Sequence, residues 1–288
     1  MVYEALLWVF MLAYLGILSV LFIRLALAFA RYRIRRRYTA ALEPPSVTVC
    51  IPARNEMHAL TQCLERVLAS NYPKLEVIVF DDESADDTSI IIRSFAQAGV
   101  RFVPGTPLPE GWLGKNHALD VLAREASGTY VLFMDVDTFI APTTISQLVG
   151  FMTSEKVAMI SVIPRRNDVG RASVLFGTLR YLWQLVSLAK HQVSSSSSLW
   201  MIKRSALLDE LGGFGDFKTV VEPETAMAVL LRRNYRCLVA NDELGVSYEK
   251  RWRSQIETSR RLFYPYFGSS WYGAVAGVVL LIFLNIPT

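Results

Sequence analysis

Cysteine is scarce in this sequence. Cys50, Cys63 and Cys237 are odd in number and widely spaced, so the chain shows neither a disulfide framework nor the ligand spacing of a zinc site. Such a pattern suits a reducing cytosol. We interpret the three cysteines as small, buried, apolar residues.

The excess of basic charge that nucleic-acid binding needs is also missing outside one short run. The chain has 30 Lys+Arg and 26 Asp+Glu, and five of the arginines lie in the run "RYRIRRR" at 31–37. Removing those five leaves 25 basic residues against 26 acidic ones. No nucleic-acid partner is therefore expected, because the pI of about 9.0 comes from that run.

Glycine-rich phosphate-binding loops are absent as well. No G-x-G-x-x-G follows the first expected strand, and "GWLGKN" at 111–116 resembles a P-loop only in part. Pro109 stands where the first glycine must be, and Asn116 replaces the Ser/Thr that would contact magnesium. A phosphate would therefore have to be neutralised by a metal on carboxylates, which Mg²⁺ and Mn²⁺ favour.

Charge is lacking altogether between Ala5 and Ile23, a stretch of 19 residues that is long enough to span a bilayer as a helix. The arginines at 31–37 place that side in the cytoplasm and attract anionic lipid headgroups. A second apolar segment, 271–288, predicts a C-terminal transmembrane segment. A cleaved signal peptide is the alternative, with "AFA" at 28–30 as its cleavage site. The start "MVYEA", which carries no positive charge, and the length of the apolar core disfavour it.

Between residues 46 and 249 the chain alternates short β-branched runs with amphipathic segments. The linker at 38–46 contains Pro44 and Pro45, which cannot continue a helix. We expect strands at 47–51, 75–80, 100–103 and 129–134, and helices at 55–70, 84–99 and 115–125. Ser84 with Asp87 is typical of a capping box, and Gly99 of a helix end. This alternation predicts an α/β domain with a mostly parallel sheet.

Polar residues follow three of these strands: "PARNE" at 52–56, "DDES" at 81–84 and "DVD" at 135–137. Ligands of open α/β sheets bind beyond the carboxyl ends of the strands, so three such clusters predict a site. A solvated turn explains only one of them. An aspartate-nucleophile phosphatase using Asp135 is a further alternative, but Phe139 stands where its signature needs Thr or Val. Its motif also normally lies on the opening strand.

Taken in order, the motifs "VTVCIPARNE", "VIVFDDESADDT", "GKNHAL" and "VLFMDVDT" resemble those of the family 2 glycosyltransferases, over roughly residues 46–265. The stretch "PLPEGWLGKNHAL" is similar to the membrane-bound branch associated with carotenoid, hopanoid and sphingolipid (ceramide) glycosylation. The resemblance implies a GT-A fold in a catalytic domain at 46–249. It also implies transfer from a nucleotide-sugar donor, with uridine diphosphate as the expected carrier.

The resemblance also implies roles for the polar residues at the strand ends. Ala53 and Glu56 would border the nucleotide base and ribose, and Asp81 and Asp82 would hydrogen-bond the uracil or ribose. Lys115 would lie near the base or diphosphate, and a surface lysine at a helix start is the alternative.

The D-x-D pair would serve a divalent cation, Mg²⁺ or Mn²⁺. Asp137 would ligate the metal that bridges the diphosphate, and Asp135 would reach the ribose, a metal-bound water or the metal itself. The cation would stabilise the departing nucleoside diphosphate.

The catalytic base of the family corresponds to "VVEPETAMAVLLRR" at 220–233. Glu224 aligns with the family's aspartate and Glu222 is its reserve, although Pro223 departs from the pattern. The alternative is that both are first-turn acids favoured by the helix dipole. The Q-x-x-R-W motif of processive synthases is absent, since "IETSRR" follows Gln255, which favours transfer of a single sugar.

The resulting hypothesis is a membrane-anchored, metal-dependent, inverting glycosyltransferase with a cytoplasmic catalytic domain at the cell membrane and a lipid acceptor. Residues 1–37 would form the anchor and its basic run, and 250–270 an interfacial segment rich in arginine and aromatic residues. "SSSSSLW" at 194–200 is either a loop or a floor near the acceptor. A non-catalytic, membrane-tethered sugar-nucleotide binder is the other alternative to the phosphatase.

Overall fold

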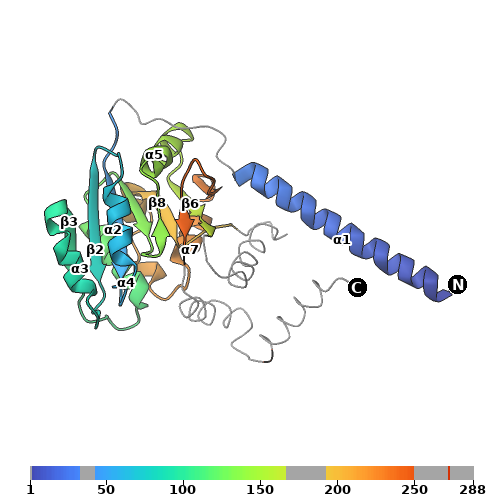
Figure 1. The fold of residues 1–288 in the computed structure, drawn as a ribbon, viewed down its shortest axis with the longest axis horizontal. Coiled ribbons are helices and arrows are strands. Elements are labelled where there is room, and N and C mark those ends of the chain that lie inside the picture. The colour runs from blue at the N-terminus through green and yellow to red at the C-terminus, as the bar shows by residue number, and fades with distance from the viewer. Residues whose placement is uncertain (1, 33–42, 167–192, 250–271, 273–288) are drawn as a thin grey trace.

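The computed structural model describes residues 2–32, 43–166, 193–249 and 272, which form an α/β domain and a long N-terminal helix (Figure 1). The predicted interfacial segment 250–270 lies outside the described residues. So do the predicted C-terminal span, apart from Tyr272, and positions 33–37 of the arginine run.

The domain is built on a seven-stranded sheet in the order β3-β2-β1-β4-β8-β6-β9. β8 pairs antiparallel with both of its neighbours, and the other strand pairs are parallel. The predicted mostly parallel sheet is therefore confirmed. The strands are β1 (Val47–Ala53), β2 (Leu75–Asp81), β3 (Val100–Pro104), β4 (Tyr130–Met134), β6 (Met159–Ile163), β8 (Leu199–Lys203) and β9 (Tyr235–Val239).

Helices cover both faces of this sheet because successive side chains of each strand point to opposite sides. Val49 and Ile51 of β1 belong to the core cluster that also includes residues of α2, α3 and α5. Cys50, between them, belongs to the cluster under α4 and α7. The helices are α2 (Leu60–Leu68), α3 (Thr88–Ser94), α4 (Gly114–Glu125), α5 (Thr144–Ser154) and α7 (Pro223–Leu230).

For the helix after β2, the predicted C-terminal end is confirmed and the predicted N-terminal end is wrong. Gly99 ends this helical region in the left-handed conformation, with φ 92°, as expected. The predicted capping box is wrong, because α3 begins at Thr88 and no side chain caps it. The Ser84 hydroxyl instead accepts a hydrogen bond from the backbone N–H of Asn55, 2.9 Å away.

A second, three-stranded sheet lies beside the D-x-D pair. Its order is β5-β10-β7, with β5 (Thr138–Phe139), β7 (Arg165–Arg166) and β10 (Ser247–Tyr248). β10 runs antiparallel to β5, which brings the N–H of Glu249 to 3.1 Å from the carbonyl oxygen of Asp137.

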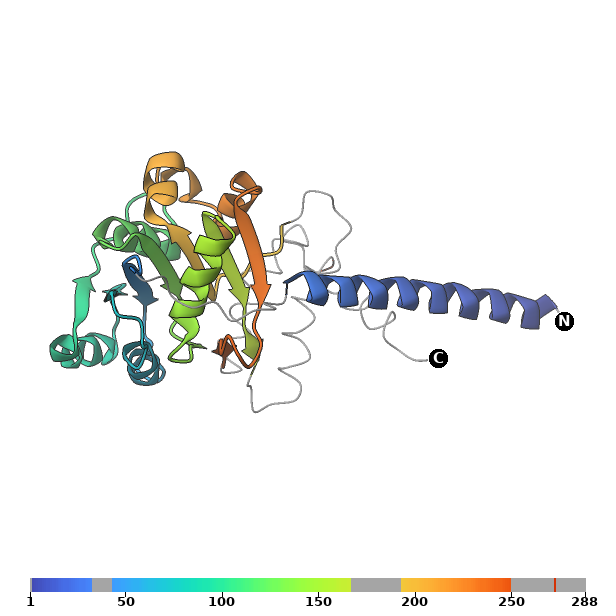
Figure 2. The same cartoon turned by 90° about the horizontal axis from the view of Figure 1, so that it is seen from above.

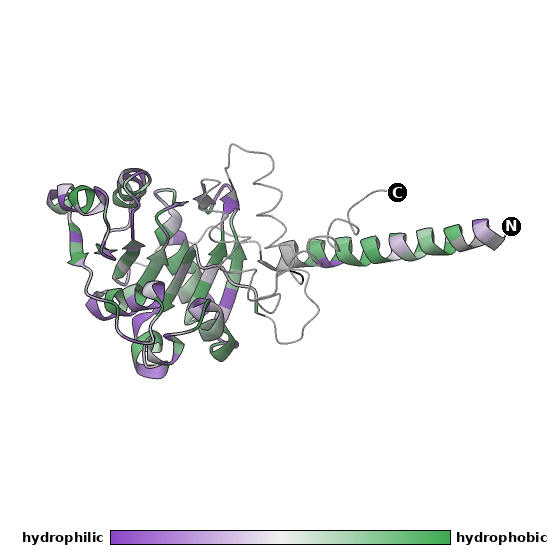
Figure 3. Ribbon diagram, turned by 90° about the horizontal axis from the view of Figure 1, so that it is seen from below, coloured by the Kyte–Doolittle hydropathy of each residue, from purple (hydrophilic) through white to green (hydrophobic). Residues whose placement is uncertain are grey.

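The N-terminal helix α1 (Val2–Tyr32) projects away from the domain (Figures 1 and 2). Its segment Leu7–Leu27 is long and apolar enough to cross a membrane, and none of it is buried. Figure 3 shows apolar residues along this helix, whereas those of the domain gather on the strands. α1 contacts β9, the edge strand at one side of the sheet.

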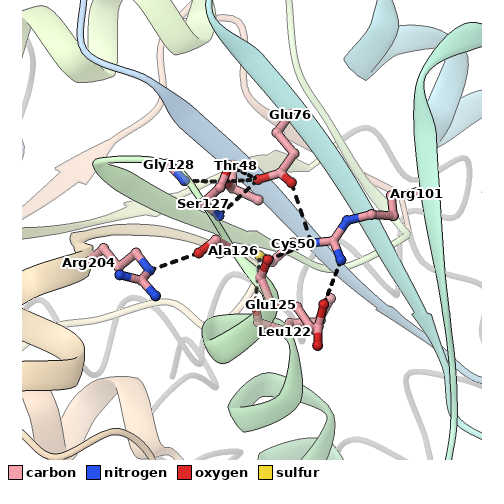
Figure 4. A network of polar contacts seen from close by, with 10 residues as sticks. All are labelled: Thr48, Cys50, Glu76, Arg101, Leu122, Glu125, Ala126, Ser127, Gly128 and Arg204. Atoms are coloured by element: carbon pink, nitrogen blue, oxygen red, sulfur yellow. Dashed lines mark hydrogen bonds and ion pairs between the residues drawn. The ribbon is translucent and has the colours of Figure 1, made fainter.

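A polar network stabilises the amino-terminal edge of the sheet, opposite the carboxyl ends (Figure 4). Glu76 of β2 accepts hydrogen bonds from Thr48 Oγ1 at 2.6 Å and from the N–H and hydroxyl of Ser127 at 3.0 and 2.8 Å. Arg101 of β3 forms ion pairs with Glu76 at 3.4 Å and Glu125 at 2.6 Å. The network therefore joins β1, β2 and β3 to the end of α4.

Burial by itself raises the pKa of the Glu76 carboxyl. The hydrogen bonds from Thr48 and Ser127 and the charge of Arg101 outweigh burial and hold that pKa below its usual value. Ionised Glu76 therefore adds stability at neutral pH, which is lost as the pH falls through the lowered pKa.

We expect Glu76→Gln to lower the Tm by about 2–4 °C at pH 7, as a loss of roughly 1 kcal/mol does in a domain of this size. The difference should shrink as the pH approaches the pKa of Glu76. Thermal unfolding of the detergent-solubilised full chain at several pH values measures both effects. Glu125→Gln, which removes the more exposed partner of Arg101, is the control and should cost less. Equal losses for the two variants would contradict the central role of Glu76.

Candidate active site

The polar clusters predicted from the sequence meet at the carboxyl edge of the sheet. Ala53 ends β1, Asp81 ends β2 with Asp82 next to it, and Asp135 follows β4 directly. β1 lies between β2 and β4 and pairs parallel with both, so the three strand ends are neighbours. Ligands of open α/β sheets occupy this position.

The loops after β1 and β2 are cross-linked by hydrogen bonds. The N–H of Asp82 donates to the Ala53 carbonyl at 2.8 Å, and the N–H of Ala85 donates to Asn55 Oδ1 at 2.8 Å. Asn55 and Glu83 adopt left-handed backbone conformations, with φ 55° and 51°. Such conformations persist only where the surroundings hold them, and here the reciprocal hydrogen bonds do so.

A second set of contacts orders the backbone at Glu56. Its N–H donates to Thr88 Oγ1 at 2.9 Å, and the N–H of Met57 donates to Asp86 Oδ2 at 3.2 Å. Burial raises the pKa of Asp86, but hydrogen bonds from Thr88 and Met57 lower it overall. Sequence reasoning missed the role of Asn55, Asp86 and Thr88 as cross-links, because their partners lie about 30 residues away.

Asp81 and Asp82 have different surroundings. Asp81 is buried, and its carboxylate accepts hydrogen bonds from the N–H of Ser84 at 3.3 Å and from the Ser89 hydroxyl. The Asp82 side chain is partly exposed and pairs with Arg54 at 3.1 Å. Asp81 therefore holds the loop, and Asp82 is the more accessible of the two carboxylates.

The start of α4 brings Lys115 into the same region. Lys115 Nζ lies 2.6 Å from Asp135 Oδ1, in an ion pair that is about one-quarter exposed on each side. A Cβ atom built on Gly114 would lie 3.4 Å from Asp82 Oδ2. The N-terminal turn of α4, with its partial positive charge, therefore lies between the carboxylates of β2 and β4.

The D-x-D pair is anchored by the serine-rich segment. The N–H of Asp135 donates to the Ser198 carbonyl at 3.0 Å, and the Thr138 hydroxyl donates to the same oxygen at 3.1 Å. Oδ1 of Asp137 is buried. Burial raises the pKa of the Cys63 thiol, and the charges of Asp137 and Glu56 raise it further.

Glu224 lies in the first turn of α7 and is only 3% exposed. Burial raises its pKa to about 7; the charge of Lys115 opposes this rise, while Glu222 and Asp135 add to it. Glu222 is the N-cap residue of α7 and is half-buried. The structure thus brings Glu224, Lys115 and Asp135 within electrostatic reach of one another, from three distant parts of the chain.

Asn116, a residue whose role sequence reasoning missed, holds the segment that leads to Glu224. It is fully buried in α4, and its side-chain amide donates to the carbonyls of Phe217 at 2.7 Å and Val220 at 2.8 Å. The N–H of Leu113 donates to the Lys218 carbonyl at 2.9 Å. These bonds fix α7 relative to Lys115. The sequence signal was that this asparagine directly follows a candidate site lysine, Lys115.

The serine-rich segment lies beneath α7 on its other side. Ser195 Oγ is 2.5 Å from Thr225 Oγ1, and the Tyr235 hydroxyl donates to the Ser194 carbonyl at 2.7 Å. Ser194, Ser195, Ser196 and Ser198 are buried. Residues 194–198 form a loop, as one of the two predictions had it, and β8 begins at Leu199. This loop supports both the D-x-D pair and the helix of Glu224, and its place near the acceptor stays a prediction.

The chemistry of Asp135 and Asp137 fits a divalent cation. Within the described part of the chain, no three His, Cys, Asp or Glu residues are grouped as metal ligands. Mg²⁺ is often bound by one or two carboxylates together with substrate phosphates, so two aspartates suffice if a diphosphate completes the shell. The buried Oδ1 of Asp137 is suitable as one such ligand.

The strand order, with one antiparallel strand and acidic residues along the carboxyl edge, defines the GT-A fold of nucleotide-diphospho-sugar transferases. A mannosyltransferase from Pyrobaculum calidifontis, PcManGT, solved in complex with GDP-Man and Mn²⁺, has this fold in common with the chain. Its TM-score is 0.62 at 23% identity, and the match covers 90% of this chain and 72% of that one.

The family model described as "Glycosyl transferase family 2" matches residues 48–209, which is more than half of the sequence. The chain belongs to this family. The matched range includes every predicted site residue except Glu222 and Glu224.

Three curated relatives are similar over part of their length. The probable glycosyltransferase YdaM of Bacillus subtilis is 27% identical over 65% of this chain and 47% of its own length. A 4,4'-diaponeurosporenoate glycosyltransferase of Staphylococcus aureus is 30% identical over 48% and 37%. The UDP-Glc:alpha-D-GlcNAc-diphosphoundecaprenol beta-1,3-glucosyltransferase WfaP of Escherichia coli is 31% identical over 38% and 43%. The chain spans less than half the length of each of these relatives.

Gly105 allows the loop after β2 to approach β3 closely. A Cβ atom at this position would lie 2.4 Å from the Asp81 carbonyl oxygen and 3.0 Å from the N–H of Glu83. Backbone atoms cannot yield as a flexible side chain can, so Gly105→Ala should displace the loop that carries Asp81 and Asp82.

We expect Gly105→Ala to destabilise the fold by about 1–3 kcal/mol and to weaken nucleotide binding. Thermal unfolding and titration with a uridine nucleotide measure the two effects. Gly215→Ala is the matched control, because a Cβ atom there meets nothing within 4 Å. If both variants bind nucleotide as the unmodified protein does, the close approach at Gly105 is unimportant for the site.

Proposed function

We propose that the protein transfers a single sugar from a nucleotide-sugar donor, linked to uridine diphosphate, to the hydroxyl group of a lipid acceptor, with inversion at the anomeric carbon. The observation that carries this proposal is the position of Glu224. Its buried carboxyl, with a pKa of about 7, converges with Lys115 and Asp135 at the carboxyl edge of a GT-A sheet. A general base works best when its pKa lies near the working pH.

Glu224 acts as the base. Its carboxylate accepts the proton of the acceptor hydroxyl, and the hydroxyl oxygen forms a bond to the anomeric carbon of the sugar. The bond from that carbon to the diphosphate oxygen breaks at the same time, and its electron pair leaves with the nucleoside diphosphate. A single displacement of this kind inverts the anomeric configuration. Glu222, two residues earlier, is the reserve base.

The loops after β1 and β2 bind the nucleoside. Asp82 is the accessible acceptor for N–H and O–H groups of the uracil or ribose, and Asp81 shares this role while holding the loop. Ala53 and the neighbourhood of Glu56 border the base and ribose. The name of WfaP gives UDP-Glc as the donor of that enzyme, which supports uridine diphosphate as the carrier.

The diphosphate would bind beside the ion pair of Lys115 and Asp135. Asp137, assisted by Asp135, would hold Mg²⁺ or Mn²⁺, which would supply positive charge to the departing diphosphate. Lys115 contributes a further positive charge, and the N-terminus of α4 adds its dipole. The Mn²⁺ in the PcManGT complex supports a divalent cation in this fold.

The acceptor is a membrane lipid, and the reaction takes place at the cytoplasmic face of the cell membrane. Two relatives support a lipid acceptor: one is named for diphosphoundecaprenol and the other for diaponeurosporenoate. Residues 1–37 form the anchor, because α1 contains a segment able to cross a bilayer. Residues 46–249 form the catalytic domain, with the predicted interfacial segment 250–270 and a second span at 271–288.

The proposed function is tested with the purified full chain, a panel of nucleotide sugars and lipid extracts as acceptors. We expect one donor to yield a lipid product heavier by one sugar, detected by mass spectrometry. Binding of a donor without hydrolysis or transfer would instead indicate a non-catalytic binder. A phosphorylated Asp135 trapped during turnover of a phosphate ester would indicate the phosphatase.

Glu224→Gln should lower turnover by roughly a hundredfold or more while donor binding stays nearly intact, as expected for a lost general base. For the unmodified enzyme, kcat/KM should rise with pH through about 7, because only ionised Glu224 accepts a proton. Rate measurements across pH test both. An active Glu224→Gln beside an inactive Glu222→Gln would show that the base is Glu222.

The raised pKa of Glu224 also predicts a change in stability. A carboxyl whose pKa rises on folding stabilises the protein at low pH, and this contribution is lost as the pH rises from about 4.5 through about 7. Glu224→Gln should therefore be more stable than the unmodified protein above pH 7, although it is inactive. A lower Tm for the variant at pH 8 would contradict the buried position of this carboxylate.

Asp137→Asn should keep the fold and remove most transfer activity, because an amide is a poor ligand for Mg²⁺ or Mn²⁺. Transfer assays before and after chelation, with each ion then restored, measure the metal dependence. Asp209→Asn is the control, because it makes the same substitution at an exposed aspartate outside the D-x-D pair. Chelated protein that transfers sugar at the full rate would overturn the metal role of Asp135 and Asp137.

A further inference from the structure

An apolar patch bordered by arginines lies where α7 passes into β9. Leu230 is 66% exposed and Val229 is 44% exposed at the end of α7. Arg232, Arg233 and Arg236 follow at once, and all three are exposed. We call these five residues the α7–β9 surface.

Arg236 shows how the basic side of this surface is held. Its Nη1 donates to the carbonyl oxygens of Tyr235 at 2.8 Å and Arg233 at 3.4 Å, so the guanidinium lies along the backbone at the start of β9. The guanidinium groups carry fixed charge at every physiological pH.

The position of β9 in the sheet shows which side of the domain carries the α7–β9 surface. β9 is one edge strand and β3 is the other, and α1 contacts β9. Figures 1 and 2 show α1 leaving the domain on the β9 side, with β3 on the far side. When α1 crosses a bilayer, as proposed above, the β9 edge is the side of the domain nearest to that bilayer.

We infer that the α7–β9 surface docks on an anionic lipid bilayer. Leu230 and Val229 enter the interfacial region, and the arginines around them pair with lipid phosphates while their stems stay along the apolar surface. Charge complementarity supports this occupant, because a cytoplasmic leaflet rich in anionic lipid attracts arginines close to a membrane anchor.

This docking assigns different tasks to the two halves of the sheet. Strands β1, β2 and β3, with the loops that carry Asp82, face away from the bilayer, where a water-soluble donor arrives. α7 ends with Leu230 on the docking surface, at the amino-terminal edge of the sheet, and carries Glu224 at its other end, towards the carboxyl edge. The inference rests on the proposed membrane location, and it adds the orientation of the domain.

The test uses fluorescent labels at two matched positions in the full chain. The three native cysteines are buried, so a cysteine introduced at the surface is the reactive one. Leu230→Cys carries the label on the α7–β9 surface. Ile90→Cys is the control, because Ile90 on α3 is also 66% exposed but lies towards the β3 side.

Both labelled proteins are reconstituted into vesicles of phosphatidylcholine with phosphatidylglycerol, and the vesicles carry a quencher on the lipid headgroup. We expect quenching of the Leu230→Cys label to exceed that of the Ile90→Cys label by about twofold or more. Equal quenching at the two positions, in protein that floats with the vesicles, would overturn the inference. Protein that does not float with vesicles at all would contradict the proposed membrane location instead.

The charge contribution is tested in the Leu230→Cys background. Replacing Arg232, Arg233 and Arg236 by Gln should reduce quenching in vesicles that contain phosphatidylglycerol and leave it unchanged in vesicles of phosphatidylcholine alone. Quenching that does not depend on phosphatidylglycerol, with or without the arginines, would overturn the anionic character of the docking surface.

Discussion

The burial of one carboxyl group, that of Glu224, is the constraint on which the active-site half of the molecule depends. Ionising a carboxyl away from water is unfavourable, and its pKa rises accordingly to about 7. The charge of Lys115 limits this rise and keeps the ionised form accessible near neutral pH. The protein therefore has to hold α7 and the start of α4 in one fixed relation, and Asn116 does so through carbonyls of both Phe217 and Val220. A shift of α7 would change the pKa of Glu224 as well as its position.

The same requirement explains why the D-x-D pair and Glu224 share a support. The Ser198 carbonyl accepts hydrogen bonds from the N–H of Asp135 and the hydroxyl of Thr138. The Ser195 hydroxyl contacts that of Thr225, the residue that follows Glu224. A run of small hydroxyl side chains allows the backbone to pass closely beneath both elements. Larger side chains would separate them, and bulky apolar ones would leave the carbonyls and hydroxyls of the serine-rich segment without partners.

The strands, and the acidic residues that follow them, could be predicted from the sequence because both depend on local pattern. β-branched runs such as Val47–Ile51 specify buried strands, and the polar residues after each run necessarily meet at one edge. The wrong prediction for Ser84 shows the limit of prediction from the local sequence. Its hydroxyl has the position of a cap, but a backbone N–H from the loop after β1 binds it instead. β8 pairs with β4 across about 70 residues of sequence, and Asn116 binds carbonyls about a hundred residues away, which no local pattern reveals. The predicted roles of the individual site residues stay predictions.

The order of the strands relates the chemistry of the site to the membrane. In the proposed inverting transfer, the acceptor hydroxyl and the departing diphosphate lie on opposite sides of the anomeric carbon. The sheet places Asp82, after β2, towards its β3 side, and α7 packs in the same core cluster as β9, the strand that α1 contacts. Under that proposal, a lipid hydroxyl would approach Glu224 from the bilayer side while the diphosphate departs towards the cytosol. The antiparallel β8 contributes to this separation, because it widens the sheet between β4, which ends at the D-x-D pair, and β9.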